Sequence, residues 1–174
     1  AQWSFDAGEW RDSGTFEVSD EGDHMLIYKS VYGWTTPSPE TISLTNNSTV
    51  TITRTYLQNG GVRVELEPAQ ARANGAQWQV DGGVWQAPGA TVTNLSPGLH
   101  TLSFFPVDDY ITPPSQTVTI NEGEVTPVVV WYTPILGSVV IMIEPSTVIS
   151  NGARWRVDGG AWIESGSTVH GIEP

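Results

Sequence analysis

The sequence predicts an all-β protein built from tandem β-sandwich repeats of about 76 residues. The first observation behind this prediction is an internal repeat. The segments AQWSFDAGEW, AQWQVDGGVW and ARWRVDGGAW begin at Ala1, Ala76 and Ala153, so the offsets are 75 and 77 residues. The second observation is the alternation of apolar and polar residues with a period of two, which is typical of half-buried strands. The third is dense turn punctuation, with 18 Gly and 12 Pro.

The repeat extends well beyond these three segments. At the same spacing the copies share six further matches, namely His24 with His100, Val31 with Val107, Trp34 with Tyr110, Pro37 with Pro113, Tyr56 with Tyr132, and Glu67-Pro68 with Glu144-Pro145. So many matches at one spacing indicate a repeated structural unit.

The complete unit begins with a strand over residues 62–67, where Val62, Val64 and Leu66 alternate with charged residues. Strands over residues 76–81 and 84–86 are expected to form a hairpin around Asp81-Gly82-Gly83, a turn of the Asp-Gly class. Further strands are predicted over residues 91–95, 100–107, 116–120 and 125–132, with Gly- and Pro-rich turns between them. No α-helix longer than a single turn is expected.

The repeat divides the chain into three parts. Residues 1–58 form a β-sandwich repeat that lacks its first strand, residues 59–134 form a complete repeat, and residues 135–174 form the N-terminal part of a third. Residue 1 falls at the second strand of a unit, and residues 171–174 match residues 94–97. We therefore expect a window from a longer array. The linkers over 57–61 and 133–138 are short, which limits hinge motion between units.

Composition disfavours several classes of function. The net charge is −12, and Lys29 is the single lysine among seven basic residues, which do not cluster in the sequence. Binding to nucleic acid or to anionic lipid is therefore disfavoured. The chain contains no cysteine, so disulfides, thiolate metal sites and thiol nucleophiles are excluded. No apolar run reaches the roughly 20 residues of a membrane span. We expect no cofactor and no metal.

The complete unit resembles the PEGA-type surface repeat. The matching positions are Gly75-Ala76, Val80-Asp81-Gly82, Pro97-Gly98-Leu99-His100, Tyr110 and Gly123-Glu124. The sequence departs from that family in two ways, because an insertion separates Pro68 from Gly75-Ala76 and because each copy carries a pair of tryptophans. The resemblance implies an immunoglobulin-like sandwich in a bacterial envelope or secreted protein, usually without enzymatic activity. It implies no particular ligand.

The tryptophan pairs are the sharpest feature, and they recur as Trp3 and Trp10, Trp78 and Trp85, and Trp155 and Trp162. A two-residue turn at Asp81-Gly82 would place Trp78 opposite Trp85 as a cross-strand pair. The structural interpretation is that the indoles cover a small core, which repetition in every unit favours. The functional interpretation is that coplanar, exposed indoles stack on sugar rings. Exposure of both rings would favour sugar binding, and burial of both against Val80 and Leu102 would favour the core.

Other polar residues suggest no chemistry. Asp6, Asp81 and Asp158 lie in turns, without the alternating acidic spacing of a calcium loop. His24 and His100 share one repeat position, but a single histidine per unit cannot hold zinc without partners, so we expect them to be hydrogen-bonded. No serine lies in a nucleophile-elbow sequence, and no long insertion could form a cleft, so no enzyme is expected.

A comparison of copies predicts an assembly surface. On the closing strand, Thr53 and Thr55 of the first copy become Val129 and Trp131 in the second. On the opening strand, Arg63 and Glu65 become Val140 and Met142 in the third. Alternation places these residues opposite the inward set. The hypothesis is that Val129, Trp131, Val140 and Met142 are covered by a neighbouring repeat or by another chain. The alternative is that both faces of these strands are buried inside one sandwich.

These observations lead to two functional hypotheses. The preferred one is a non-catalytic, stiff spacer or fibre-forming segment of a secreted or cell-surface protein, whose partners are neighbouring repeats and other copies of itself. The alternative is a carbohydrate-binding array that uses exposed tryptophan pairs, with a polysaccharide as its partner.

Overall fold

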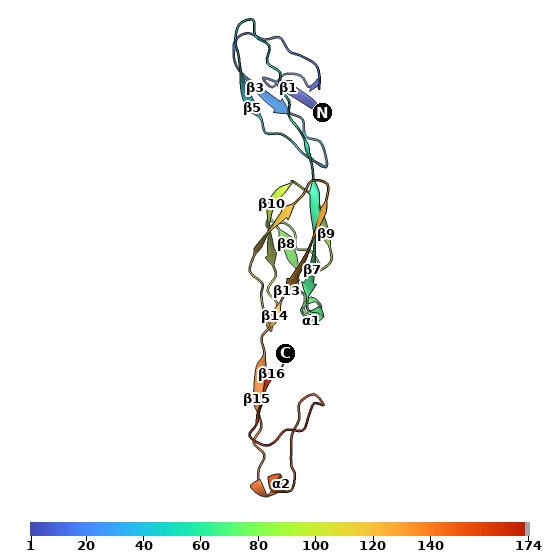
Figure 1. Ribbon diagram of the computed structural model, residues 1–174, viewed down its shortest axis with the longest axis vertical. Coiled ribbons are helices and arrows are strands. Elements are labelled where there is room, and N and C mark those ends of the chain that lie inside the picture. Colours follow the sequence, from blue (N-terminus) through green and yellow to red (C-terminus); the bar gives the residue numbers. More distant parts are fainter. Residues whose placement is uncertain (173–174) are drawn as a thin grey trace.

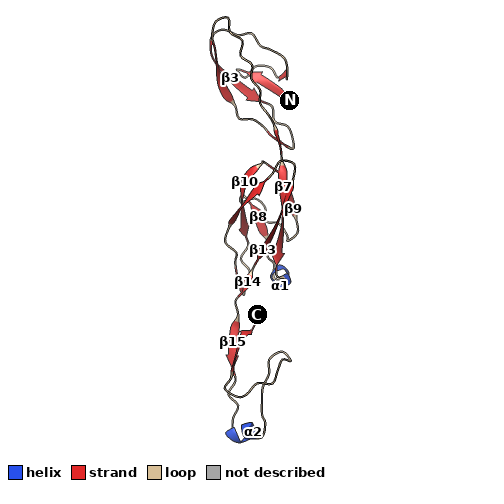
Figure 2. Cartoon of the chain, viewed as in Figure 1, coloured by secondary structure: helices blue, strands red, loops and turns tan. Residues whose placement is uncertain are grey.

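The computed structural model describes residues 1–172, which form three β-rich units along one long axis (Figure 1). We call residues 1–58 the first unit, 59–134 the central unit and 135–172 the third unit. Strands make up almost all of the regular structure, so the prediction of an all-β fold is confirmed at this level (Figure 2). The helices within residues 1–172 are two short ones, at equivalent positions of the central and third units.

The central unit consists mainly of two three-stranded sheets. The first has the order β12-β10-β8, formed by Gln116–Ile120, Gly98–Phe104 and Trp78–Val80, and all its pairings are antiparallel. The second has the order β13-β7-β9, formed by Val125–Trp131, Gly60–Glu67 and Thr91–Leu95. Two of the predicted strands, 91–95 and 116–120, have the bounds that the sequence predicts.

One buried cluster joins the two sheets. Strand β7 contributes Val62, Val64 and Leu66, which are fully buried, whereas Arg63 between them is exposed, as the alternation predicts. The other sheet contributes side chains to the same cluster, with further residues from the connecting loops; they include Trp78, Val80, Leu102, Phe104, Val118 and Ile120. The core of the molecule therefore lies in the central unit.

The first and last strands of the central unit lie side by side and run in the same direction. Strand β13 pairs in parallel with β7 in an unbroken register from Val125 opposite Gly61 to Trp131 opposite Glu67. Strand β9 pairs with the other edge of β7 in the antiparallel direction. Within the described residues, β9 and β13 each pair with β7 alone, so this sheet depends on β7.

The first unit has a different set of sheets. Its main sheet has the order β2-β1-β3-β5, formed by Arg11–Asp12, Gln2–Phe5, Gly22–Tyr28 and Glu40–Leu44. The counterparts of β9 and β13, residues 15–19 and 49–55, form no strand. Their apolar side chains reach solvent: Phe16, the counterpart of the core-packed Val92, is exposed.

The third unit contains one pair of strands and a short helix within the described residues. Strand β15, Gly137–Val140, pairs with β16, Thr168–Ile172, in the antiparallel direction, as β7 pairs with β9. The match between opening strands is therefore seen in their pairing as well as in their sequence.

The two helices are the feature that the strand pattern did not predict. Helix α1, Ala69–Ala73, and helix α2, Ser146–Ser150, have five residues each, slightly more than the single turn that was expected as the limit. Proline precedes each helix, where its missing N–H is not needed, and Asn74 or Asn151 followed by a glycine ends it. The insertion that separates Pro68 from Gly75-Ala76 is therefore a helix.

Candidate functional site

A tight turn of one conformation precedes the second tryptophan in all three units. In the central unit, Asp81 and Gly82 have φ values of 49° and 70°, and the Gly83 N–H donates to the Val80 carbonyl at 2.9 Å. The first unit has the same turn at residues 5–8 and the third at residues 157–160, each closed by a bond of 2.8 Å. Two consecutive residues with positive φ are typical of a type I′ turn, as the Asp-Gly sequence predicts.

The register beyond this turn differs from the expected one by one residue. Trp78 pairs with Gln86, not with Trp85, through two backbone hydrogen bonds. The equivalent positions agree, because Trp3 pairs with Arg11 and Trp155 pairs with Ile163. The return segment therefore carries one extra residue in every copy. Because side chains alternate with a period of two, this shift sends the two tryptophans of a pair to opposite faces.

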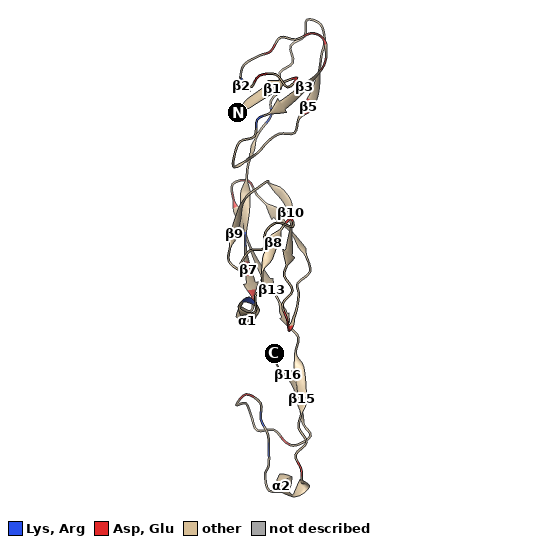
Figure 3. Cartoon of the chain, turned by 180° about the vertical axis from the view of Figure 1, so that it is seen from behind, with Lys and Arg blue, Asp and Glu red and all other residues tan. Residues whose placement is uncertain are grey.

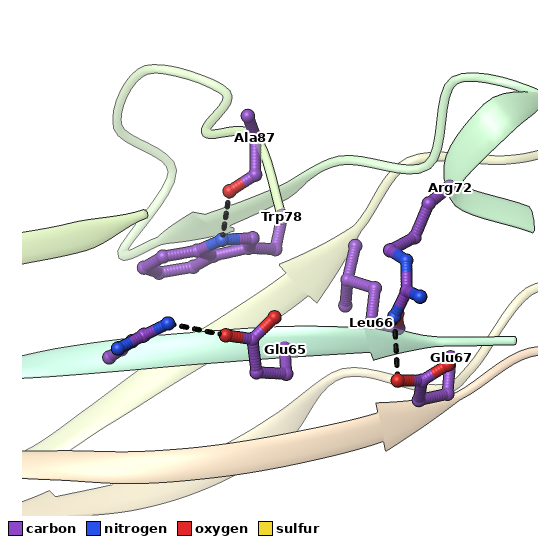
Figure 4. A network of polar contacts seen from close by, with 7 residues as sticks. Glu65, Leu66, Glu67, Arg72, Trp78 and Ala87 are labelled. Atoms are coloured by element: carbon purple, nitrogen blue, oxygen red, sulfur yellow. Dashed lines mark hydrogen bonds and ion pairs between the residues drawn. The ribbon is translucent and has the colours of Figure 1, made fainter. Parts of the chain in front are cut away.

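Of the inward tryptophans, Trp78 belongs to the buried cluster that joins the two central sheets, and the other two are buried to different degrees. Trp78 is 0% exposed and Trp155 is 9% exposed, and Trp3 is partly buried. Each indole N–H donates to a backbone carbonyl of the return segment: Trp78 Nε1 lies 3.0 Å from the Ala87 oxygen (Figure 4). The corresponding distances are 3.2 Å from Trp3 to Asp12 and 3.1 Å from Trp155 to Glu164. The polar atom of the indole is thus satisfied in the interior, as a buried tryptophan requires.

The outward tryptophans each meet a different neighbour. Trp85 is partly buried, and its ring packs edge-to-face against Phe105 at a centroid distance of 5.2 Å. Trp10 and Trp162 are exposed, and each carries a cation over its ring: Lys29 Nζ lies 5.7 Å from the first and Arg156 Cζ lies 4.6 Å from the second. No unit therefore presents the two coplanar, exposed indoles that the sugar-stacking hypothesis needs.

Both linkers between units are held in sheets, and in the same way. After the first unit, β6, Leu57–Gln58, pairs with β4, Trp34–Thr35; after the central unit, β14, Thr133–Pro134, pairs with β11, Tyr110–Ile111. The next residue adds a backbone bond in each case. Asn59 N–H donates to the Gly33 carbonyl and Ile135 N–H donates to the Asp109 carbonyl, both at 2.8 Å. The two junctions thus share one register, 76 residues apart.

Asn59 joins the first unit to the central one through its side chain. Its Oδ1 accepts a hydrogen bond from the Thr35 hydroxyl at 2.6 Å, and its Nδ2 donates to Asn94 Oδ1 at 2.8 Å. The residue after it, Gly60, is buried, and a Cβ there would lie 2.7 Å from the Glu124 carbonyl oxygen. Neither residue was singled out from sequence, since only their contacts across the junction give them a role.

A tyrosine hydroxyl anchors the end of each of the first two units. The Tyr56 hydroxyl donates to the Lys29 carbonyl at 2.7 Å, and the Tyr132 hydroxyl donates to the Phe105 carbonyl at 2.8 Å. Burial raises the pKa of Tyr132 to about 12. The sequence match between these two tyrosines marked them as equivalent, but it did not reveal the carbonyl each one binds.

The turn aspartates and the repeated histidines, treated separately in the sequence, lie together. In the central unit, His100 Nδ1 lies 2.6 Å from Asp81 Oδ2, and in the first unit His24 Nδ1 lies 2.7 Å from Asp6 Oδ2. The second carboxylate oxygen accepts the N–H of the residue after the histidine, at 2.8 Å in both units. We call this arrangement the Asp–His clamp. The near-constant separation of Asp and His in the two copies was the signal that could have predicted it.

The four residues of the predicted assembly surface are all exposed. Val129 and Val140 are about half exposed, Trp131 is 66% exposed and Met142 is 71% exposed. Within residues 1–172, neither strand has both faces buried inside one unit. On β13, Val129 and Trp131 lie opposite Glu65 and Glu67 of β7, which form ion pairs with Arg63 and Arg72. Figure 4 shows the pair of Glu67 with Arg72.

Within the described part of the chain, neither basic residues nor metal-ligating residues gather at one place. The seven basic residues are scattered over the three units (Figure 3). Within residues 1–172, no group of three or more metal-ligating side chains comes together. No helix in this range is long and apolar enough to span a membrane.

No protein-family model and no curated protein matches this sequence. Among solved structures, a chain described as the Bacillus anthracis TIE protein is similar over 86% of this chain, with a TM-score of 0.41 and 13% sequence identity. The likeness covers 34% of that chain, so the present sequence spans about a third of its length. A likeness at this level bears on neither fold nor function.

Proposed function

We propose that this chain is a non-catalytic segment of tandem immunoglobulin-like β-sandwich repeats that acts as a stiff spacer in a secreted or cell-surface protein. The observation that carries the proposal is the identical construction of the two junctions. A flexible linker would leave its backbone groups to water, whereas here each linker is paired to the preceding unit and continues directly into the next strand.

The immunoglobulin-like sandwich rests on the two sheets that share one core and on the resemblance to PEGA-type repeats. The same contacts recur at the repeat spacing: the type I′ turn, the indole bond to the return segment, the tyrosine bond and the Asp–His clamp. Contacts that repeat at one spacing are expected of a tandem array. The resemblance also supports the placement at a bacterial surface.

Fibre formation is the second part of the proposal. It is supported by exposed apolar side chains on both sides of the second junction, Val129 and Trp131 on β13 and Val140 and Met142 on or just after β15, since exposed apolar surface often marks an interaction site. The expected partner is another repeat, of the same chain or of another copy.

Carbohydrate binding is the alternative, limited to single indoles instead of pairs. It would use single outward indoles, of which Trp162 is the most open at 60% exposure. The cations over Trp10 and Trp162 compete for the ring faces on which a sugar would stack. Titration with soluble polysaccharides, followed by tryptophan fluorescence, tests this alternative, and Trp162→Ala should abolish any response.

Small-angle scattering of the unaltered chain, combined with electron microscopy, tests the spacer. We expect a single population of extended particles with a narrow spread of lengths. Asn59→Ala should broaden that spread, because it removes the side-chain bonds to both units, whereas Asn46→Ala in an exposed turn should not. A broad distribution of angles between units in the unaltered chain would rule out a stiff spacer.

A further inference from the structure

The Asp–His clamp places both ring nitrogens of its histidine against acceptors. In the central unit, Nδ1 faces Asp81 Oδ2 at 2.6 Å and Nε2 faces the Ser96 carbonyl oxygen at 2.7 Å. In the first unit, Nδ1 of His24 faces Asp6 at 2.7 Å and Nε2 faces the Asp20 carbonyl at 3.0 Å. Neutral imidazole carries one N–H and cannot donate to both partners, whereas imidazolium can.

The surroundings favour the charged ring in both units. The histidine side chains are only 12% and 10% exposed, whereas the aspartates that they face are 49% exposed. On the adjacent strands, His24 faces Ile42 and His100 faces Val118, which carry no charge. Further neighbours of His24 are the stacked ring of Phe5 and the Asp20 carboxylate, and a further neighbour of His100 is the Ser96 hydroxyl. No cation faces either ring among these contacts.

The clamp also fixes the geometry of the fold. Asp81 heads the type I′ turn, and its two oxygens bind the His100 ring and the Thr101 N–H of β10. The third contact comes from the β9–β10 turn through Ser96. One imidazolium therefore ties the hairpin turn to β10 and to the turn before it.

We propose that the Asp–His clamp is a proton-dependent contact that makes the stability of the first and central units sensitive to pH, with release of the hairpin turn when the histidine loses its proton. In both units the histidine faces the turn aspartate and a backbone carbonyl, so the two units weaken together as the pH rises. The third unit carries Asp158 in the same turn.

The sign of this pH dependence of stability follows from the pKa of each histidine. For His24, the Asp6 hydrogen bond is the main cause that raises the pKa above 6.5. For His100, burial lowers the pKa, but the bonds to Asp81 and Ser96 outweigh it, so the pKa is raised as well. A folded-state pKa above the unfolded value stabilises the fold fully below about pH 6.5, and this stability is lost as the pH rises through the folded-state pKa.

Thermal unfolding between about pH 6 and about pH 9 tests the proposal, because carboxylates are ionised throughout this range. We expect the melting temperature to fall as the pH rises. For each clamp, the unfolding constant should grow by about tenfold for each unit by which the histidine pKa in the folded state exceeds that in the unfolded state. The double variant His24→Gln/His100→Gln should lose this dependence. The control His170→Gln changes an exposed histidine of β16 and should keep it.

NMR of the imidazole nitrogens in the unaltered chain gives a second readout that does not depend on variants folding. We expect His24 and His100 to stay doubly protonated above pH 6.5, and Asp81→Asn to lower the pKa of His100 alone. Asparagine tolerates the positive φ of this turn and keeps an acceptor for Thr101. Titration of both histidines at or below 6.5, or an unchanged pH slope in the double variant, would overturn the proposal.

Discussion

The burial of Trp78 makes a quantitative prediction for the central unit. Trp78→Ala removes a fully buried indole and its hydrogen bond to the Ala87 carbonyl. Replacing a core tryptophan by alanine destabilises proteins by about 3–5 kcal/mol. We expect a loss within this range, about 4 kcal/mol, because the indole is fully buried. Since small domains are stable by only about 5–15 kcal/mol, the central unit should be close to unfolding.

Trp85→Ala is the matched control, since it removes the same side chain seven residues later in the same hairpin. Its ring is partly buried and packs against Phe105, a contact worth about 1 kcal/mol. The two variants should therefore differ by about 3 kcal/mol, or roughly 100-fold in the unfolding constant.

Chemical denaturation combined with hydrogen exchange, read over residues 60–132, measures both variants in the unit concerned. Equal losses for Trp78→Ala and Trp85→Ala would refute the one-residue shift that separates the two rings. A loss below about 1 kcal/mol for Trp78→Ala would refute its place in the core.

Three further variants probe the junctions and the surface. Gly60→Ala should destabilise the central unit by about 1–3 kcal/mol in a denaturant titration, since the new Cβ would meet backbone oxygens. Gly137→Ala, at the same repeat position, has room for a Cβ and should be neutral. Equal effects of the two variants would contradict this reasoning. Tyr132→Phe should lose about 1 kcal/mol by removing the bond to the Phe105 carbonyl, and an unchanged melting curve would count against that bond. The double variant Trp131→Thr/Met142→Glu should lower self-association in analytical ultracentrifugation and leave folding intact. A loss of stability without a change in association would refute the proposed interface.

The sequence predicted the features that depend on local pattern. Alternation located the strands of both central sheets, and the Asp-Gly sequence predicted the tight turn. The pairing of Trp78 was wrong because the extra residue lies after the turn, where no sequence signal distinguishes Gly83 and Val84 from ordinary strand residues. The short helix α1 was missed because five residues are too few to show a helical period.

Features that depend on distant parts of the chain could not be predicted in this way. The parallel pairing of β7 with β13 joins segments about 65 residues apart, and alternation is the same for parallel and antiparallel neighbours. The role of Asn59 likewise depends on Thr35 and Asn94, which only the folded junction brings together. The Asp–His clamp falls between these cases, because its two members recur in sequence but their contact requires the hairpin to fold back on β10.

The parallel pairing of β7 with β13 has a mechanical consequence. The chain enters the central unit at the start of β7 and leaves it at the end of β13, so its two points of attachment lie at opposite ends of one ladder. Tension between these two points would slide the two strands past one another. All seven paired positions resist together, instead of opening one at a time as in a hairpin pulled from its free ends. The arrangement directs pulling force onto the strongest direction of the sheet.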